Sequence, residues 1–197
     1  MKTAPLVWGG IFIRIDYMSK IENNTSLFDN TDELLNSKQI IKVLKTLQKK
    51  QPEIYCGKGE FKRLIIEFEK GISEKELSSV LKKHKGFVFP QEYTDLLRFS
   101  NGINFFEYGD ALLFNLEETF ELSDEEWLEQ GYLKIARANE DDIYMKCDKS
   151  ERNIYFSAEG FGELTPLNMS FNAFLEASLI SGFSYFWLWG TKDYDLY

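Results

Sequence analysis

Apolar positions in the first part of the chain switch between the spacing of a strand and the spacing of a helix. In residues 11–17, Ile11, Ile13, Ile15 and Tyr17 alternate with Phe12, Arg14 and Asp16, and this period of two predicts a strand. Residues 37–50 instead repeat apolar side chains at helical intervals, and Pro52 follows their end. Residues 61–69 alternate again, as in a second strand. We therefore expect residues 1–70 to form a strand–helix–strand extension.

Two short helices are predicted next. Ser73 and Glu76 form the sequence signature of a capping box, which predicts a helix that runs toward Gly86. Pro90 can occupy the first turn of a second helix, where its missing N–H needs no partner. We interpret this second helix and its Asn-Gly end as scaffold that packs under a sheet and leads residues 103–116 into a first strand; its motif residues are Pro90, Tyr93, Leu96, Leu97, Asn101 and Gly102.

Short strand-like runs dominate the rest of the chain. They occupy residues 111–116, 132–138, 142–148 and 153–159, and charged or glycine-containing turns separate them, which favours an antiparallel meander. Residues 123–130 could form a helical turn with Ser123 as its cap and Glu126 at the third position. Residues 170–180 predict an amphipathic helix whose apolar side holds Phe171, Phe174, Leu175, Leu179 and Ile180.

The order of these pieces resembles the SUKH superfamily over residues 71–181. The matching stretches are FVFPQEYTDLLRFSNG, ALLFNL, YLKIARANEDDIYMKCD, NIYFSAE and SFNAFLEASL. Many members carry another glycine where this chain has Ile103, and the acidic ANEDD replaces a glycine-rich turn. Residues 1–70 and the aromatic tail, residues 182–197, have no counterpart in the resemblance.

This resemblance implies the fold class and the kind of function. The fold would be α+β, an antiparallel β-sheet meander flanked by helices, used as a binding module and not as an enzyme. Bacterial members look like immunity proteins that neutralise polymorphic toxins, often nucleases or other enzymes that modify nucleic acids. Eukaryotic relatives are similar in fold and act as interaction hubs in regulatory networks.

The composition is that of a globular protein, with 44% hydrophobic and 16% aromatic residues. Cys56 and Cys147 are too far apart for a metal or redox motif, so we expect two reduced cysteines. The N-terminal apolar run is short and interrupted by charges, which argues against a cleavable signal. No stretch approaches the roughly 20 apolar residues of a membrane span. These observations favour a cytoplasmic protein that does not bind membranes.

Acidic side chains are concentrated in one segment. The formal net charge of the chain is −9, and residues 107–142 alone hold 12 acidic and 2 basic side chains. Such a surface would repel phosphates, so nucleic acid is an unsuitable partner. It would attract a basic protein surface instead.

We expect this segment to bind a protein partner, with carboxylates for rapid association and aromatic side chains as anchors. The candidate residues are Glu117, Glu118, Asp124, Glu125, Glu126, Trp127, Tyr132, Glu140, Asp141 and Asp142, and Phe120 is a further aromatic candidate. Two alternatives remain open for the carboxylates: a merely solvated acidic face, or a metal or glycosidase-type site. The aromatic residues could equally belong to the core.

Little else in the sequence suggests chemistry. His84 is the single histidine, and Cys147 lies in a predicted strand interior, where a thiol is inert. We therefore predict no catalytic residue, no metal site and no cofactor. The expected function is that of an immunity protein that neutralises a cognate toxin by binding its basic active-site cleft. The alternatives are a regulatory scaffold or interaction hub and an acidic-site, metal-dependent hydrolase.

Overall fold

The chain divides into two units, Met1–Asp32 and Glu33–Tyr197. In the computed structural model of the protein, the described residues all belong to the second unit, and they are 35–56, 61–107, 111–138, 141–148, 150, 152–157, 162–184 and 186. The strand predicted over residues 11–17, the candidate Glu140 and most of the aromatic tail lie outside them.

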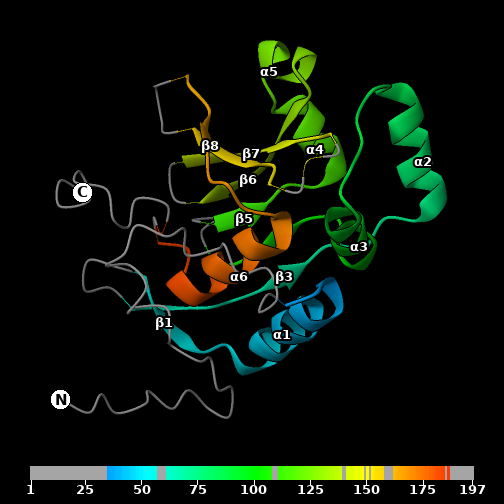
Figure 1. The fold of residues 1–197 in the computed structure, drawn as a ribbon. Coiled ribbons are helices and arrows are strands. Elements are labelled where there is room, and N and C mark those ends of the chain that lie inside the picture. Colours follow the sequence, from blue (N-terminus) through cyan, green and yellow to red (C-terminus); the bar gives the residue numbers. More distant parts are fainter. Residues whose placement is uncertain are drawn as a thin grey trace. The chain divides into compact units, whose positions relative to one another are not determined.

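A seven-stranded antiparallel sheet is the centre of the described fold (Figure 1). Its spatial order follows the chain order from β3 to β9, so the predicted meander and the α+β class are confirmed. The longest pairing joins β6 to β7, with a register shift between Lys134 and Ala136. The strands are β3 (Glu67–Phe68), β4 (Ile103–Asn104), β5 (Ala111–Leu113), β6 (Tyr132–Ala138), β7 (Asp141–Lys146), β8 (Ile154–Ser157) and β9 (Thr165–Pro166).

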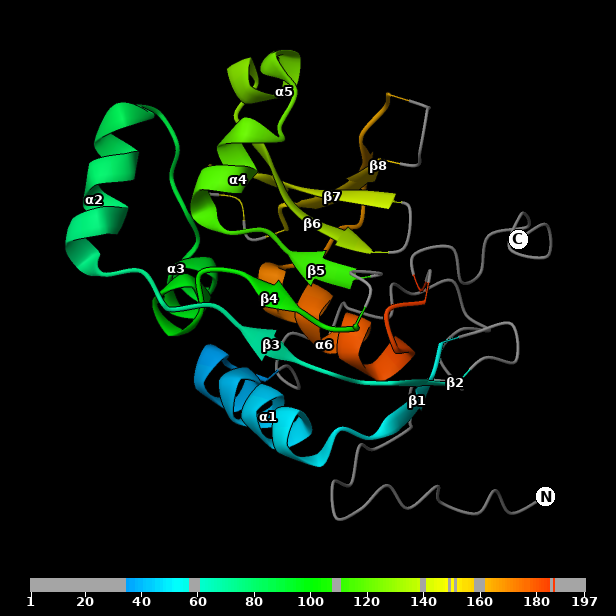
Figure 2. The same ribbon diagram turned by 180° about the vertical axis from the view of Figure 1, so that it is seen from behind.

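Three helices pack against one another beside this sheet: α1 (Ser37–Lys50), α3 (Gln91–Phe99) and α6 (Phe171–Ser181). Figure 2 shows the same arrangement from behind, with α6 crossing the sheet and α1 next to it. Tyr93 of α3 meets Phe171 of α6 edge to face, with 5.1 Å between ring centroids. Because α6 contacts neighbours on several sides, even its Asn172 and Ser178 are buried. The amphipathic prediction for α6 is wrong at Ile180, which is 44% exposed.

The N-terminal extension is only partly as predicted. Helix α1 spans residues 37–50 as expected and starts from an Asn36–Gln39 capping box. The single strand predicted over residues 61–69 is wrong, because the chain divides it between two sheets. There, β2 (Phe61–Arg63) pairs with β1 (Glu53–Tyr55), whereas β3 joins the main sheet. Leu64 and Ile66 lie between them and are buried.

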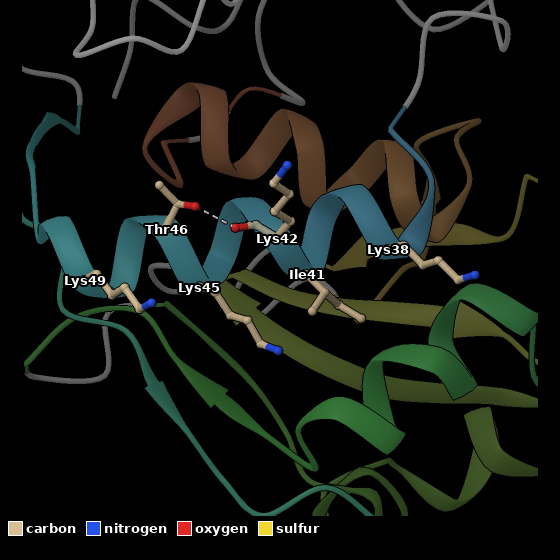
Figure 3. A pocket seen from close by; sticks show the side chains of 6 residues that line it. All are labelled: Lys38, Ile41, Lys42, Lys45, Thr46 and Lys49. Carbon is tan, nitrogen blue, oxygen red and sulfur yellow. Dashed lines mark hydrogen bonds between the residues drawn. The ribbon is translucent and has the colours of Figure 1, made fainter.

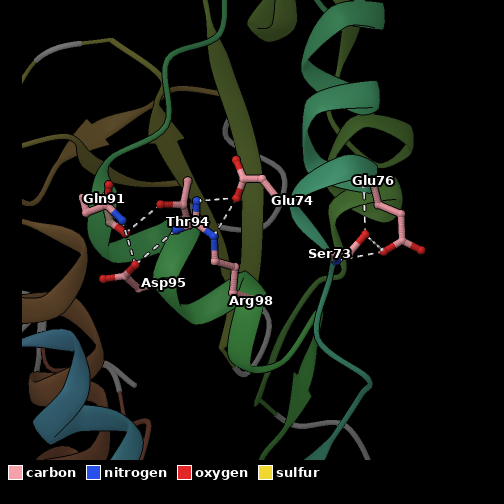
Figure 4. Close-up of polar contacts among 7 residues, drawn as sticks. All are labelled: Ser73, Glu74, Glu76, Gln91, Thr94, Asp95 and Arg98. Carbon is pink, nitrogen blue, oxygen red and sulfur yellow. Dashed lines mark hydrogen bonds and ion pairs between the residues drawn. The ribbon is translucent and has the colours of Figure 1, made fainter.

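The two helices between β3 and β4 start close to the positions that their sequence signals predicted. Ser73 and Glu76 form the capping box of α2 (Glu74–Lys83). Pro90 was expected in the first turn of α3 but lies one position earlier, at the N-cap, where it makes no side-chain hydrogen bond. Figure 4 shows how Arg98 of α3 reaches Glu74 at the start of α2, with 2.7 Å between Nη2 and Oε2. Gly102 has a φ of +122°, a conformation that suits glycine.

The path after Gly102 differs from the expected strand over residues 103–116. The chain forms the β4–β5 hairpin and then a helix that was not predicted, α4 (Leu116–Glu121). Asn101 has a structural role beyond ending α3, because its Oδ1 accepts a hydrogen bond from the Leu116 N–H at 3.0 Å. Among the described residues, no helix has the length and apolar character that a bilayer crossing requires.

Candidate functional site

Two short helices present the acidic segment. Asn115 and Glu118 form a capping box that starts α4, and Asp124 is the N-cap residue of α5 (Glu125–Glu129). Ser123 is not the cap that the sequence suggested. Its hydroxyl donates to the Thr119 carbonyl and accepts from the Lys134 N–H at 2.7 Å, which ties the turn to β6.

Six exposed carboxylate side chains lie on α4 and α5 and in the turn between them, and together they are called the acidic surface: Glu117, Glu121, Asp124, Glu125, Glu126 and Glu129. No lysine or arginine occurs from residue 107 to residue 133 in the sequence. Glu118 is half-buried and accepts a hydrogen bond from the Asn115 N–H at 3.1 Å, so its carboxylate is partly committed to the cap. The negative electrostatic potential of this region therefore comes mainly from the six exposed carboxylates.

An aromatic row adjoins α5 and consists of Trp127, Tyr132 and Tyr155. Their ring centroids are 5.9 Å and 5.0 Å apart in edge-to-face contacts, and all three side chains are half-buried. Nζ of Lys146 lies 4.1 Å from the Tyr132 ring centroid and donates to the Gln130 carbonyl at 2.7 Å. The row therefore joins α5 to β6 and β8 and leaves part of each ring accessible.

Tyr144 supports this arrangement from beneath. Its side chain is 2% exposed, and its hydroxyl donates to Oδ2 of Asp124 at 3.1 Å. Burial raises the pKa of the Tyr144 hydroxyl, and the negative charge of Asp124 raises it further. The N-cap residue of α5 is thus held to β7, which limits how far the acidic surface can move relative to the aromatic row.

The expected cluster of Asp141 and Asp142 is not an exposed acidic patch. Asp141 is 7% exposed. Asp142 is bound by Nζ of Lys134 at 2.6 Å and Nε of Arg137 at 3.1 Å. Strand register explains these contacts, since Arg137 and Asp142 face each other across β6 and β7. The charge of Asp142 is largely compensated within the sheet.

Phe120 is buried and so is not available as an anchor for a partner. It is 8% exposed, and its ring stacks on the His84 imidazole with 3.8 Å between centroids. Burial and then the neighbouring Lys83 lower the pKa of His84. Phe120 therefore contributes to the packing of α2 against α4.

The residues of the scaffold motif lie in α3 and at its two ends. Tyr93, Leu96 and Leu97 are buried, and Gly102 adopts the positive φ of an Asn-Gly end. In contrast, the sequence patterns did not single out Tyr155, Tyr144 and Lys146. They alternate with apolar residues along β7 and β8, which was a usable signal, but their contact with the Trp127 region depends on the strand register.

The described residues offer few groups for catalysis. Cys147 is 4% exposed, and burial raises the pKa of its thiol, which disfavours the reactive thiolate. No group of three or more His, Cys, Asp or Glu side chains that could hold a metal ion occurs among them. The exposed groups of this region are the carboxylates of the acidic surface and parts of the aromatic row.

Residues 71–177 match the SMI1/KNR4 family (SUKH-1). The chain belongs to this family. The matched span starts just before α2 and ends inside α6, so it contains the Pro90 helix, strands β4 to β9 and the acidic surface. Helix α1 and strands β1 to β3 precede it. Among known proteins, the chain is similar to the Bacillus subtilis (strain 168) protein YobM, described as uncharacterized, with 26% identity over 159 residues, which cover 70% of this chain and 82% of YobM.

Proposed function

We propose that this family member is a non-enzymatic immunity protein that binds and neutralises a cognate toxin domain. The observation that carries the proposal is the acidic surface on α4 and α5, placed directly beside the aromatic row. Membership of the family supports a role in binding partner proteins. The toxin domain expected from this chemistry acts on nucleic acid and has a basic active-site cleft.

The acidic surface suits such a cleft because carboxylates can take the place of phosphates. Six exposed carboxylates occur in a stretch of the sequence without a basic residue, so the two helices themselves contribute no compensating charge. A cleft that binds a phosphate backbone has the complementary positive field. Attraction of this kind accelerates the encounter of the two proteins and weakens as salt increases.

The aromatic row would add affinity that charge alone does not supply. Tryptophan and tyrosine are the residue types most often found at the energetic centre of interfaces. Trp127 and Tyr132 are held by edge-to-face contacts, and Asp124 is tied to the buried Tyr144. A surface that is already ordered loses less conformational entropy on binding.

The proposal is tested by isolating the partner and measuring its binding kinetics. The full chain is used as bait to capture the toxin domain, and association with the captured domain is followed by surface plasmon resonance. The E125K/E126K/E129K variant should associate at least about tenfold more slowly, because steering by charge sets the association rate. An E53K/E67K/E163K control carries the same change in charge at exposed positions outside the acidic surface.

Other outcomes would favour other functions. Equal association rates for the two triple variants would contradict the acidic surface as the binding site. Capture of many housekeeping proteins, in place of one toxin, would support a regulatory hub. Heat released on titration with magnesium, calcium or manganese, together with metal-dependent substrate turnover, would support an acidic-site hydrolase.

A further inference from the structure

Helix α1 carries a second charged surface of opposite sign. Lys38, Lys42, Lys45 and Lys49 recur at intervals of three and four residues, so they share one side of the helix. All four side chains are exposed, and we call them the lysine stripe. Ile40 and Leu44 are buried, which fixes the orientation of α1 on the core.

The lysine stripe borders an open groove of about 390 Å³ that Ile41 and Thr46 also line (Figure 3). Lys45 places its Nζ 4.8 Å from the ring centroid of Phe99. None of the ion pairs found within the described residues involves a lysine of the stripe. The four lysines span about 16 Å along the helix axis at about 1.5 Å per residue.

The sequence of α1 strengthens this charge, because residues 37–50 contain five lysines and no acidic residue. The stripe is therefore a locally positive surface on a protein whose formal net charge is −9. The acidic surface is the matching negative region of the same chain. In both views α1 lies below the sheet and α5 above it, so one molecule cannot join the two surfaces.

We propose that the lysine stripe docks onto the acidic surface of a second copy of this chain. Charge complementarity is the reason for this choice of occupant: four exposed lysines would face six exposed carboxylates. The pairing is weak and reversible, because exposed ion pairs are screened by water and salt.

Two other polyanions fit the surface less well. Stable binding of α1 to an anionic bilayer would need several large apolar side chains next to the lysines, but the groove offers one half-buried Ile41, and Ile40 and Leu44 face the core. A nucleic acid would meet a protein with an excess of negative charge and no aromatic residue within α1 for base stacking. A second copy of the chain avoids both difficulties.

Self-association of this kind would regulate toxin binding, a consequence that rests on the proposed function. The carboxylates that contact the second copy are those that would contact the toxin. Toxin and second copy therefore compete, and an excess of toxin releases the monomer. The pairing itself does not depend on any toxin and can be tested with the purified chain.

The test is sedimentation velocity on the full chain at about 0.01 M and about 1 M salt, where the Debye length is about 30 Å and about 3 Å. The wild type should associate with increasing concentration at low salt and remain monomeric at high salt. The K38E/K42E/K45E/K49E and E121K/E125K/E126K/E129K variants should each be monomeric at low salt. Mixing these two variants should restore association, because the unchanged acidic surface of the first can meet the unchanged stripe of the second, and the two reversed surfaces can meet each other.

A matched control reverses four exposed lysines elsewhere, in the K75E/K82E/K83E/K85E variant. This control changes the formal charge as much as the stripe variant does, yet it should retain most of the association. Circular dichroism establishes that every variant is folded, and a K38Q/K42Q/K45Q/K49Q variant replaces the stripe variant if that one does not fold.

Three results would overturn the proposal: a wild type that is monomeric at every concentration in low salt, equal effects of the stripe and control variants, or no association in the mixture. Binding of a monomeric wild type to anionic vesicles or to RNA, lost in the stripe variant, would assign the stripe to those partners instead. Toxin binding that persists in the stripe variant would leave the proposed function intact whichever result is obtained.

Discussion

The imidazole ring of His84 stacks on the phenyl ring of Phe120, with their centroids 3.8 Å apart. This contact joins the end of α2 to α4, and burial is the main reason why the pKa of His84 is lowered. In the unfolded chain, His84 would titrate near its ordinary pKa of about 6.5. The folded state therefore takes up this proton less readily than the unfolded state.

Linkage then predicts a loss of stability with acidification. The contribution of His84 is fully present above the unfolded pKa of about 6.5 and is lost as the pH falls through the lower pKa of the folded state. An H84F variant keeps an aromatic ring against Phe120 but does not titrate. We expect the Tm of the wild type to fall relative to that of H84F between about pH 7 and about pH 5. A difference in Tm that is constant over this range would contradict the linkage.

The hydrogen bond from Tyr144 to Asp124 predicts a measurable contribution to the stability of α5. A Y144F variant loses the bond without leaving a cavity, so the free energy of unfolding should decrease by about 1 kcal/mol. A double-mutant cycle with D124A would isolate the interaction, since alanine removes the acceptor and Asp124 is exposed and makes no side-chain cap hydrogen bond of its own. If the coupling free energy between the two positions is zero, the bond does not hold α5 to the sheet.

A single methyl group added at Gly71 should destabilise the fold through a steric clash. An added Cβ would overlap the carbonyl group of Arg98, which belongs to the backbone of α3 and cannot rotate away. A G71A variant should lose about 1–3 kcal/mol of unfolding free energy, measured by urea denaturation. Gly86 provides the comparison, because its φ is +104° but nothing lies within 4 Å of the position that an added Cβ would occupy, so G86A should lose only about 1 kcal/mol. Equal losses at both positions would contradict the steric explanation.

Local signals made parts of this fold predictable from the sequence. The start of α2 depends on Ser73 and Glu76, which lie three residues apart, and strands β6 and β7 follow runs that are visible in the sequence. The start of α4 had a comparable signal in Asn115 and Glu118. However, α4 has only six residues, which is too short for a helical repeat of apolar positions to be recognised.

Other features depend on contacts between distant residues and could not be read from a local pattern. Leu64 and Ile66 belong to a run that alternates as one strand, yet the pairing of β2 with β1 and of β3 with β4 divides that strand. In the candidate site, the density of carboxylates was visible, whereas the neutralisation of Asp142 by Lys134 and Arg137 needed the register of β6 and β7.

The two cysteines should differ in reactivity. Cys147 is buried, with a thiol pKa raised by burial, whereas Cys56 is only partly buried. Thiol reagents such as 5,5′-dithiobis(2-nitrobenzoate) should therefore modify Cys56 in the native protein and reach Cys147 only after unfolding. Absorbance during the reaction measures this directly, and C56S and C147S variants assign each phase. Rapid native modification of the C56S variant would show that Cys147 is accessible.

In the proposed interface, the aromatic row and the acidic surface should affect different rates of toxin binding. Trp127 is a large aromatic side chain held against Tyr132, so a W127A variant should mainly accelerate dissociation of the toxin complex. Reversal of Glu125 and Glu126 should mainly slow association, and this effect should vanish in high salt. Because Trp127 is half-buried, W127A could also weaken the fold. A W127F variant with near-wild-type stability serves as the control, because faster dissociation in this folded variant reports lost contact with the partner. An unchanged dissociation rate in W127A would remove the aromatic row from the interface and leave the acidic surface alone to account for binding.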